Sequence, residues 1–408
     1  MTNAARSSQD STPAAAAGAP PPSSEAAGFD IAAVRAMAAA CGATLDLDAY
    51  GPATRFDPAA RVDSAARIDS AGSPAAVNAQ AGIVPPSLHA LSAGAVAPLL
   101  DWGLLRLEGA DAVSFLQSQT TNDLAKQPLD EARWHGYCTA KGRLLATMLI
   151  WRDEAAVRLL LPRPLTAAIR KRLSMYVLRA KAKFSDESDH YALLGVCGAG
   201  APAALASLGL AAPAPMRLAA AAPFTAIGLP ACPLGGEALP RWWLLTPVER
   251  LPQLWAQLSA SLAPVGSEAW RWMDIRCGLP RIVPATSEQF VPQMLNLDAI
   301  DGVSYTKGCY PGQEIVARSH YLGKLKRRSF IGELQAGAAH AAQPLPGSDV
   351  TDAGGAPVGM VVSAAATPEG GVALLFESQI AAVQGEAGVR VDGRPVRVIE
   401  LPYPLPAH

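Results

Sequence analysis

The most informative stretch of this sequence is Lys307-Gly308-Cys309-Tyr310-Pro311-Gly312-Gln313-Glu314, which continues as Ile315-Val316-Ala317-Arg318. Gly308 and Gly312 lack a Cβ, so the backbone can turn sharply or approach a ligand closely there. Pro311 and Glu314 suit the first turn of a helix, because proline needs no amide donor there and a carboxylate complements the helix dipole. We therefore expect a turn that leads into a helix.

Cys309 is the reactive group of this stretch. A position just before a helix N-terminus, with Lys307 two residues away, favours the thiolate, which is the nucleophilic and metal-binding form. A glycine-rich turn with a buried, inert cysteine explains the same residues, because cysteine is often buried. The residue types alone leave both interpretations open.

The string KGCYPGQE resembles the signature of the YgfZ family, the folate-binding relatives of the glycine-cleavage T-protein. The family pattern is K-G-C-Y-x-G-Q-E, and each fixed position is met. The supporting flanks are Pro280-Arg281-Ile282, Gln289-Phe290-Val291-Pro292-Gln293, Asn296-Leu297 and Val316-Ala317-Arg318. Such a match with flanks is far more specific than a lone glycine pattern. The resemblance extends over about residues 95–400 and is weak between about 200 and 260.

Length and composition are typical of a globular protein with two or three domains. The chain has 408 residues, of which 50% are hydrophobic, and a formal net charge of −1 with a pI near 6.6. This balance gives no overall field that would attract nucleic acid or an anionic membrane. No apolar run of membrane-spanning length occurs, and the N-terminus lacks the basic head and leucine-rich core of a signal peptide. We therefore expect a cytoplasmic protein without a membrane partner.

The six cysteines lie far apart, at positions 41, 138, 197, 232, 277 and 309. No C-x-x-C occurs, so a stably held iron–sulfur cluster or structural zinc has no local support. The spacing does not indicate a disulfide framework and suits a reducing cytoplasm. An isolated Cys309 can serve a metal only as a transient ligand.

The order of the expected elements indicates an α+β protein. Strands are expected at 103–108, 134–139, 144–152, 156–161, 178–184, 191–196 and 241–246, and helices at 110–119, 165–176, 251–262 and 267–276. Short alternating strands at 330–334, 358–363, 372–376, 389–391 and 396–401 predict a small β-barrel. No glycine-rich dinucleotide motif or phosphate loop is present, so the sequence gives no support for nicotinamide or ATP chemistry.

The resemblance implies the T-protein-like folate-binding fold of two related α+β domains and a small C-terminal β-barrel. We expect a folate-binding α+β domain with the motif at 91–185 and 265–325, a second α+β domain at 186–264, and the barrel at 326–408. Residues 1–90 are predicted to be a low-complexity, largely disordered extension with one short helix at 29–41. Residues 42–86 are expected to be disordered or loosely docked, and 198–222 to be looped.

A polar cluster at 117–124 follows the helix expected at 110–119. Its amides and hydroxyls, those of Gln117 and Asn122 among them, fit either a ligand-facing lip or a hydrogen-bonded turn. Together with Arg276, Gln293 and Asn296, these two residues are the expected lining of a folate cleft.

Two departures from T-protein argue against aminomethyl transfer. The strand after the Lys141-Gly142 hairpin turn carries an Asp-Asp pair in T-protein, and the aligned positions here are Ala146 and Thr147, neither of which can act as a base. The glutamate that grips the pterin in T-protein is replaced by Arg276. Cys309 stands where T-protein has an acidic residue, which exchanges a hard oxygen for a soft thiol.

The resemblance implies a folate-binding accessory protein that supports maturation or repair of iron–sulfur enzymes. Its clients would include the radical enzymes that methylthiolate tRNA, so the effect on tRNA would be indirect. Cys309 would be the essential thiol, and Lys307 and Arg318 would stabilise its anion or a folate carboxylate. The other motif residues would shape the loop and orient or pack against the ligand: Gly308, Tyr310, Gly312, Gln313 and Glu314. The expected cofactor is tetrahydrofolate or a related folate.

Two alternatives stay open. One is a tetrahydrofolate-dependent, aminomethyltransferase-like enzyme that uses a different carboxylate. The other is direct tRNA binding by the segment 155–185, which has no acidic residue and eight basic ones: Arg158, Arg163, Arg170, Lys171, Arg172, Arg179, Lys181 and Lys183. Such an asymmetry suits a polyanion, and a solvated helix face explains it as well.

Overall fold

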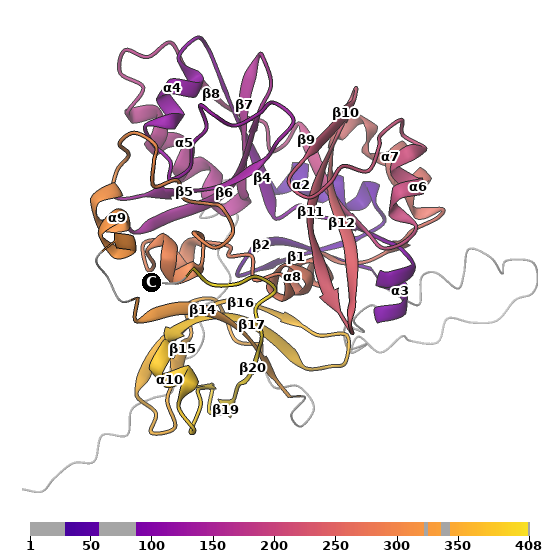
Figure 1. Ribbon diagram of the computed structural model, residues 1–408. Helices are drawn as coiled ribbons and strands as arrows, with labels where there is room; N and C mark the ends of the chain where they lie inside the picture. The colour runs from indigo at the N-terminus through magenta and orange to yellow at the C-terminus, as the bar shows by residue number, and fades with distance from the viewer. Residues whose placement is uncertain (1–28, 57–86, 322–324, 336–342, 407–408) are drawn as a thin grey trace, which may run out of the picture.

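The structure is a computed structural model that describes residues 29–56, 87–321, 325–335 and 343–406. Sheets of five, six and seven strands form its main layers, together with a two-stranded hairpin. Figure 1 shows the five-stranded and six-stranded sheets next to each other, with the C-terminal barrel beneath them. The α+β class and the barrel agree with the prediction, whereas the predictions for 1–28 and 57–86 fall outside the described residues.

The five-stranded sheet is antiparallel and has the order β5-β6-β7-β4-β8. Its elements are β4 (Trp102–Glu108), α4 (Ala112–Gln117), β5 (Arg133–Cys138), β6 (Leu144–Arg152), β7 (Ala156–Pro162), η2 (Arg163–Leu165), α5 (Thr166–Met175) and β8 (Lys183–Asp186). The strand predicted at 178–184 is wrong for residues 178–182. Its pairing partner β4 ends at Glu108, opposite Lys183, so no edge remains for the earlier residues to pair with.

The six-stranded sheet has the order β10-β11-β12-β9-β3-β13 and is antiparallel except between β3 and β13. Its elements are α3 (Leu88–Ala93), β3 (Ala95–Pro98), β9 (Tyr191–Cys197), α6 (Ala201–Ala206), β10 (Leu218–Ala221), β11 (Phe224–Leu234), β12 (Glu237–Pro247), η3 (Val248–Arg250), α7 (Leu251–Ser259) and β13 (Ala263–Pro264). The loop predicted at 198–222 contains α6 and β10, because apolar side chains such as Leu205 are buried against this sheet. β3 lies in the range predicted for the first domain but pairs with β9.

Residues 29–56 form α2 (Ile31–Ala40), β1 (Thr44–Asp48) and β2 (Gly51–Arg55). The predicted helix is present, and its Val34 and Met37 are buried in the core of the six-stranded sheet. The hairpin β1–β2 contradicts the disordered or loosely docked stretch predicted there. It is ordered because Tyr50 reaches the barrel, where its hydroxyl accepts from the amide of Ala364 (2.6 Å) and donates to the carbonyl oxygen of the same residue (3.2 Å).

The segment between the second sheet and the barrel contains α8 (Ser267–Arg276), η4 (Pro284–Thr286), η5 (Pro292–Leu295) and α9 (Gln313–Tyr321). The helix predicted at 267–276 is confirmed as α8. Its buried Arg271 lies over the ring of Tyr50, with Cζ 3.7 Å from the ring centroid, and forms an ion pair with Asp48 at 3.0 Å. α8 therefore binds the N-terminal hairpin to the centre of the molecule.

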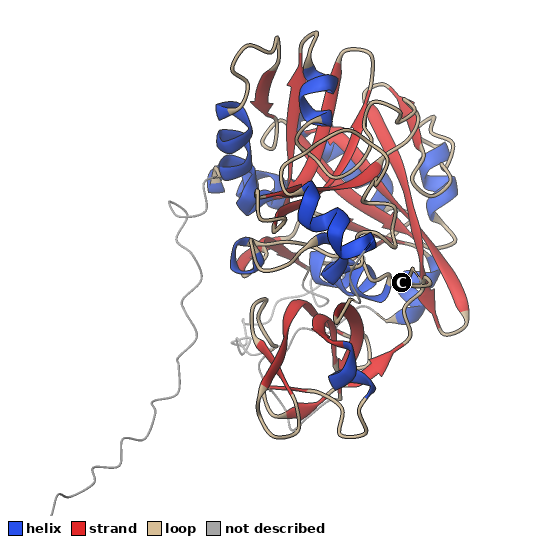
Figure 2. Cartoon of the chain, turned by 60° about the vertical axis from the view of Figure 1, so that its left-hand side comes forward, coloured by secondary structure: helices blue, strands red, loops and turns tan. Residues whose placement is uncertain are grey.

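The C-terminal sheet curls into a nearly closed barrel of seven strands with the order β19-β18-β15-β16-β17-β14-β20. Its elements are β14 (Arg327–Leu334), β15 (Asp349–Thr351), β16 (Pro357–Ala366), β17 (Val372–Gln379), α10 (Ile380–Gln384), β18 (Arg390–Val391), β19 (Arg394–Pro395) and β20 (Arg397–Ile399). Figure 2 shows that the barrel consists almost wholly of strands, with one short helix at its side. Among the described residues, no helix has the length and apolar character needed to span a membrane.

Candidate functional site

Residues 307–312 form an irregular loop before α9, and Cys309 is exposed on this loop. The structure describes all six cysteines, and the other five are buried. A Cβ built on Gly308 would meet nothing within 4 Å, so the backbone next to the thiol borders open space. Of the two interpretations of Cys309, the inert buried cysteine is therefore excluded.

Gly312 holds this loop against the turn between β5 and β6. Its φ is +80°, a value that favours glycine, and a Cβ built there would lie 2.5 Å from the carbonyl oxygen of Thr139 and 2.6 Å from the Cα of Gly142. Gly142 also has a positive φ, +71°, and a Cβ on it would lie 3.0 Å from the Cβ of Ile315. The two glycines therefore allow the motif loop and the hairpin turn to pack backbone against backbone.

Lys307 anchors the beginning of the loop. Its Nζ donates hydrogen bonds to the backbone carbonyls of Gln117, Thr120 (2.5 Å) and Asn122 (3.1 Å). Burial lowers the pKa of Lys307 to about 8, and the negative charge of Asp123 partly opposes this effect. All three donors are thus used within the protein, and the role predicted for Lys307 toward a Cys309 thiolate or a folate carboxylate stays a prediction.

The polar cluster after α4 is a hydrogen-bonded turn. Gln117 donates from Nε2 to Asp123 (2.9 Å), and its Oε1 accepts from two backbone amides. Asn122 donates from Nδ2 to the carbonyl oxygens of Trp134 (3.0 Å) and Asp301. The turn is therefore the correct interpretation for Gln117, whereas Asn122 belongs to the turn and also borders a cavity.

Gln293 and Asn296 connect the motif helix to the barrel. Gln293 is fully buried and donates from Nε2 to the carbonyl oxygen of Val316 in α9 (2.7 Å). Asn296 has a φ of +57° and donates from Nδ2 to the carbonyl oxygen of Ser329 in β14 (2.8 Å). Both amides therefore position α9 and β14, and neither borders a described cavity.

Two ion pairs join the barrel to the same region. Arg328 Nη1 lies 2.7 Å from Oδ1 of Asp298, and both side chains are buried. Arg276, which was expected in a folate cleft, has its Nη1 3.5 Å from Oε1 of Glu333 in β14. Arg276 therefore contacts the barrel, and its role toward a ligand stays a prediction.

The two positions aligned with the acid pair of T-protein are structural in this protein. Ala146 is buried in β6. The hydroxyl of Thr147 donates to the carbonyl oxygen of Pro280 (3.2 Å) and accepts from the amide of Ile282 (3.2 Å). Thr147 thus fastens the chain after α8 to β6, and neither of the two aligned side chains carries a carboxylate.

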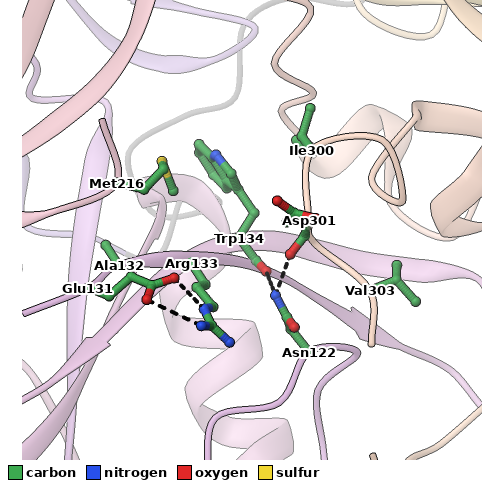
Figure 3. Close-up of a pocket in the computed structure, with 9 residues that line it drawn as sticks. All are labelled: Asn122, Glu131, Ala132, Arg133, Trp134, Met216, Ile300, Asp301 and Val303. Atoms are coloured by element: carbon green, nitrogen blue, oxygen red, sulfur yellow. Dashed lines mark hydrogen bonds and ion pairs between the residues drawn. The ribbon is translucent and has the colours of Figure 1, made fainter. Parts of the chain in front are cut away.

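A cavity of about 330 Å³ opens beside the start of β5. It is lined by Asn122, Glu131, Ala132, Arg133, Trp134, Met216, Ile300, Asp301 and Val303 (Figure 3). In Figure 3 the indole of Trp134 projects between Met216 and Ile300. Its Nε1 is buried and has no hydrogen-bond partner among the described residues. The cavity thus offers apolar side chains beside a buried indole, which packs on Trp102 and Trp243 inside the protein.

Charged groups lie along one side of this cavity. Arg133 forms two bonds to Glu131, from Nε to Oε1 (2.6 Å) and from Nη2 to Oε2 (3.2 Å). Arg217, next to the lining residue Met216, pairs with Asp130 at 3.1 Å. Both guanidinium groups near the opening are therefore already neutralised by carboxylates of the protein.

A second cavity of about 340 Å³ lies between β6, η5 and the barrel. Its lining is Arg143, Gln289, Phe290, Met294, Arg327, Pro357, Gly359, Met360 and Glu377. Arg327 pairs with both carboxylate oxygens of Glu377 at 2.8 Å, which largely neutralises the charge there. Cys309 lines neither of the two described cavities.

The remaining motif residues fall into an anchored and an exposed group. Gln313 donates from Nε2 to the carbonyl oxygen of Lys307 (3.4 Å), as expected for a residue that fixes the loop. Tyr310 is buried, with its ring centroid 5.1 Å from the Lys307 Nζ, so it packs inside the protein. Glu314 and Arg318 are exposed on α9. Their roles toward a ligand or a thiolate stay predictions.

Of the five residues predicted to line a folate cleft, only Asn122 borders a described cavity. Sequence reasoning missed Trp134, Met216 and Ile300, because they come from three separate segments and no local motif marks them. Trp134 at the start of a predicted strand was the one available signal. Among the described residues, no group of three or more His, Cys, Asp or Glu side chains could hold a metal ion.

The arrangement of these layers around α8 defines the fold of the glycine-cleavage T-proteins. The structure is similar to the crystal structure of glycine cleavage system aminomethyltransferase T from Bartonella henselae, with a TM-score of 0.67 over 91% of this chain and 96% of that chain. The two sequences are 16% identical, so this likeness shows the fold alone. No protein-family model matches the chain.

Sequence similarity to curated proteins is more specific. The chain is 33% identical over 235 residues to the tRNA-modifying protein YgfZ of Sodalis glossinidius (strain morsitans), which covers 57% of this chain and 69% of the relative. It is also 33% identical over 230 residues to the protein of that name in Yersinia pseudotuberculosis serotype O:1b (strain IP 31758), covering 56% and 68%. The chain therefore belongs to the YgfZ family, as its motif predicted.

Proposed function

We propose that this protein is a folate-binding accessory factor that supports the maturation or repair of iron–sulfur enzymes through the thiol of Cys309. Membership of the YgfZ family supports the proposal, because the relatives are named tRNA-modifying proteins. Radical enzymes that methylthiolate tRNA depend on iron–sulfur clusters, so a factor that maintains such clusters affects tRNA indirectly. The protein would act in the cytoplasm.

The observation that carries the proposal is the exposure of Cys309 on an anchored loop. Lys307 fixes the loop to the turn after α4, and Gly312 fixes it to the turn after β5. An accessible thiolate can bind iron or react with an oxidised sulfur centre, whereas a buried thiol cannot. One thiol supplies one ligand, so its contact with a cluster would be transient.

We place the folate in the cavity beside Trp134. Its volume of about 330 Å³ lies within the range of small-molecule sites. Met216, Ile300 and Val303 line it with apolar side chains that would pack on a pterin ring. A carboxylate of the glutamate tail would reach Arg133 only by competing with Glu131 for its guanidinium. A reduced folate bound there supplies a carrier for one-carbon units.

Aminomethyl transfer has less support than this accessory function. The T-protein-like fold alone does not imply the activity, because one fold supports many functions. The two residues aligned with the acid pair are Ala146 and Thr147, and the Thr147 hydroxyl is used to bind the backbone. No group at this place can accept a proton from an amine donor.

The test of the thiol replaces Cys309 with serine, which keeps the shape and removes the sulfur. A strain that lacks the gene would be complemented with the wild type, with Cys309→Ser, or with Thr306→Ala as a control in the same loop. We expect wild type and Thr306→Ala to restore iron–sulfur enzyme activity and tRNA methylthiolation under oxidative stress, and Cys309→Ser to fail. Full complementation by Cys309→Ser would refute the proposal.

The test of the folate site fills the cavity from its rim. Ile300→Trp, with Met360→Ala in the second cavity as the control, would be titrated with tetrahydrofolate by calorimetry. We expect Ile300→Trp to weaken binding by at least about tenfold and Met360→Ala to leave it unchanged, because only the first substitution occupies the site. Equal affinity of both variants for tetrahydrofolate would contradict the placement of the folate in this cavity.

A further inference from the structure

The end of α5 exposes an unusual group of apolar side chains. Met175 is 59% exposed, Tyr176 51% and Leu178 86%, so three large apolar residues stand in solvent within four positions. Single exposed apolar residues are normal on protein surfaces, whereas a contiguous group marks an interaction site. We refer to residues 175–178 as the apolar tip.

Exposed cations flank the apolar tip. Arg170 and Lys171 precede it on α5, and Arg179, Lys181 and Lys183 follow it. None of these five side chains forms an ion pair with another described residue, in contrast to Arg55 or Arg217 elsewhere on the surface. Acidic residues also lie close: the Asp111 carboxylate accepts a hydrogen bond from the Lys181 amide (2.7 Å), and Glu108, which pairs with Arg106, lies opposite Lys183 in the sheet. The surface around the tip therefore keeps an excess of positive charge.

The fold gives these apolar residues no internal partner. The alternating pattern from 178 onward predicts a strand, but Leu178 lies in a bend beyond the end of the partner strand β4. The chain between α5 and β8 thus presents Leu178, its most exposed large apolar side chain, to solvent. A surface that is at once apolar and positive needs a partner that is apolar and negative.

The apolar tip lies on the same part of the molecule as the motif loop. Burial raises the pKa of Tyr137 in β5, and the positive charge of Arg172, next to the tip, opposes this effect. Figure 1 shows α5 and α9 on one side of the molecule, near β5 and β6. A partner bound at the tip would therefore lie on the same side of the molecule as α9, the helix that follows the motif loop.

We propose that the apolar tip and its flanking cations are a docking surface for an acidic, amphipathic helix of a partner protein. Aliphatic side chains such as Met175 and Leu178 are buried by other apolar side chains, as in helix-in-groove recognition. A nucleic acid would satisfy the cations and could stack one base on Tyr176, but it offers nothing apolar to Leu178. A protein partner uses both halves of the surface, so it is favoured over RNA.

The experiment measures binding of the full chain to a labelled synthetic helix by fluorescence anisotropy. The probe is a peptide of about 20 residues with leucines at i, i+3, i+4 and i+7 and glutamates elsewhere. A second peptide has serines in place of the leucines, and a tRNA transcript is the third probe. The tip variants are Leu178→Ser and the pair Arg170→Glu with Lys171→Glu. Leu129→Ser and Arg250→Glu, exposed at other places, are the matched controls.

We expect the leucine peptide to bind at least about tenfold more tightly than the serine peptide, and Leu178→Ser to remove most of this difference. The charge-reversal pair should weaken binding about tenfold at low salt and less at about 0.5 M salt, where screening is strong. Both control variants, and Cys309→Ser, should bind like the wild type. The peptide-binding experiment therefore tests the docking surface independently of the proposed role of the Cys309 thiol.

Three results would overturn the proposal. The first is a wild-type chain that does not distinguish the two peptides. The second is leucine-peptide binding that both tip variants leave unchanged. The third is tRNA binding that is tighter than peptide binding, is lost on charge reversal and is insensitive to Leu178→Ser, because this result would assign the surface to a nucleic acid.

Discussion

Gly312 of the motif packs directly on Gly142 of the β5–β6 turn, so that a Cβ on Gly312 would lie 2.6 Å from the Cα of Gly142. The contact joins two segments that are far apart in the sequence and leaves Cys309 on the outer side of the loop. The glycines of the motif therefore serve two purposes, since Gly312 permits close packing and Gly308 borders open space.

Gly312→Ala should destabilise the protein by about 2–4 kcal/mol, because it combines an unfavourable positive φ with a steric clash. Gly370→Ala is the control: Gly370 has a φ of +86° and nothing within 4 Å of a built Cβ, so it reports the φ effect alone. Urea unfolding measures the loss of stability in both variants. Equal losses at the two positions would show that the contact with Gly142 does not matter.

Lys307→Met should lower the free energy of unfolding by about 2–4 kcal/mol, because it leaves buried backbone carbonyls without a donor. The turn at 117–124 should also loosen, which hydrogen exchange of its amides would report. Lys126→Met, an exposed lysine in the same turn, should change stability by less than about 0.5 kcal/mol. A stable Lys307→Met with normal amide protection would contradict the anchoring role.

Buried His135 should make stability depend on pH below neutrality. Burial, followed by the charge of Lys307, holds the pKa of His135 well below its usual 6.5, so the unfolded chain takes up a proton that the folded chain does not. The stabilising effect is complete above pH 6.5 and is lost as pH falls, with a slope of about 1.4 kcal/mol per pH unit. Urea unfolding should show this slope in wild type and in exposed His190→Gln, but not in His135→Gln; the same slope in all three would refute the assignment.

The buried pair of Arg328 and Asp298 should be strongly coupled. Asp298→Ala should cost about 3–5 kcal/mol, because it leaves a buried guanidinium without its carboxylate. Arg328→Met with Asp298→Leu should cost less than the sum of the single changes. Arg397→Met, an exposed barrel arginine paired with Glu333, should cost about 1 kcal/mol at most. The free energies of unfolding of the two single variants and the double variant would be compared by thermal unfolding. Stability losses that simply add up would argue against direct coupling of Arg328 and Asp298.

Tyr50→Phe should destabilise the protein by about 1–3 kcal/mol, because the amide and carbonyl of Ala364 lose the hydroxyl that satisfies them. Limited proteolysis should then cut the hairpin at 44–55 sooner than in the wild type. Tyr321→Phe, at a position 65% exposed, provides the control with unchanged stability and cleavage. Unchanged cleavage in Tyr50→Phe would mean that the hairpin is held by other contacts.

The elements that were predictable from the sequence are those with a local pattern. β6 is buried at eight of its nine positions, so its apolar run was clear, and the motif showed the turn before α9. The hairpin at 44–55 has no such pattern, because it is ordered by contacts with residues more than 200 positions away, such as the ion pair of Asp48 with Arg271. A composition rich in alanine and aspartate conceals this kind of order.

The site was predictable only where its residues are adjacent in sequence. The motif marked Cys309 as a candidate thiol but left its exposure open, and the three acceptors of Lys307 lie nearly 190 residues earlier and could not be inferred. Trp134 was missed for the same reason, since the cavity is formed by segments that only the tertiary fold brings together. Amides such as Gln293 look like ligand-binding groups in the sequence, but they bind the backbone.

The bond between Tyr50 and Ala364 spans 314 residues, and this distance determines when the hairpin can be completed during translation. At a bacterial elongation rate of about 5–20 residues per second, the barrel strand leaves the ribosome about 15–60 s after the tyrosine does. The hairpin at 44–55 is therefore synthesised early but is among the last elements to be secured. Until then, the nascent chain depends on chaperones or on its own solubility to keep this aromatic side chain out of wrong contacts.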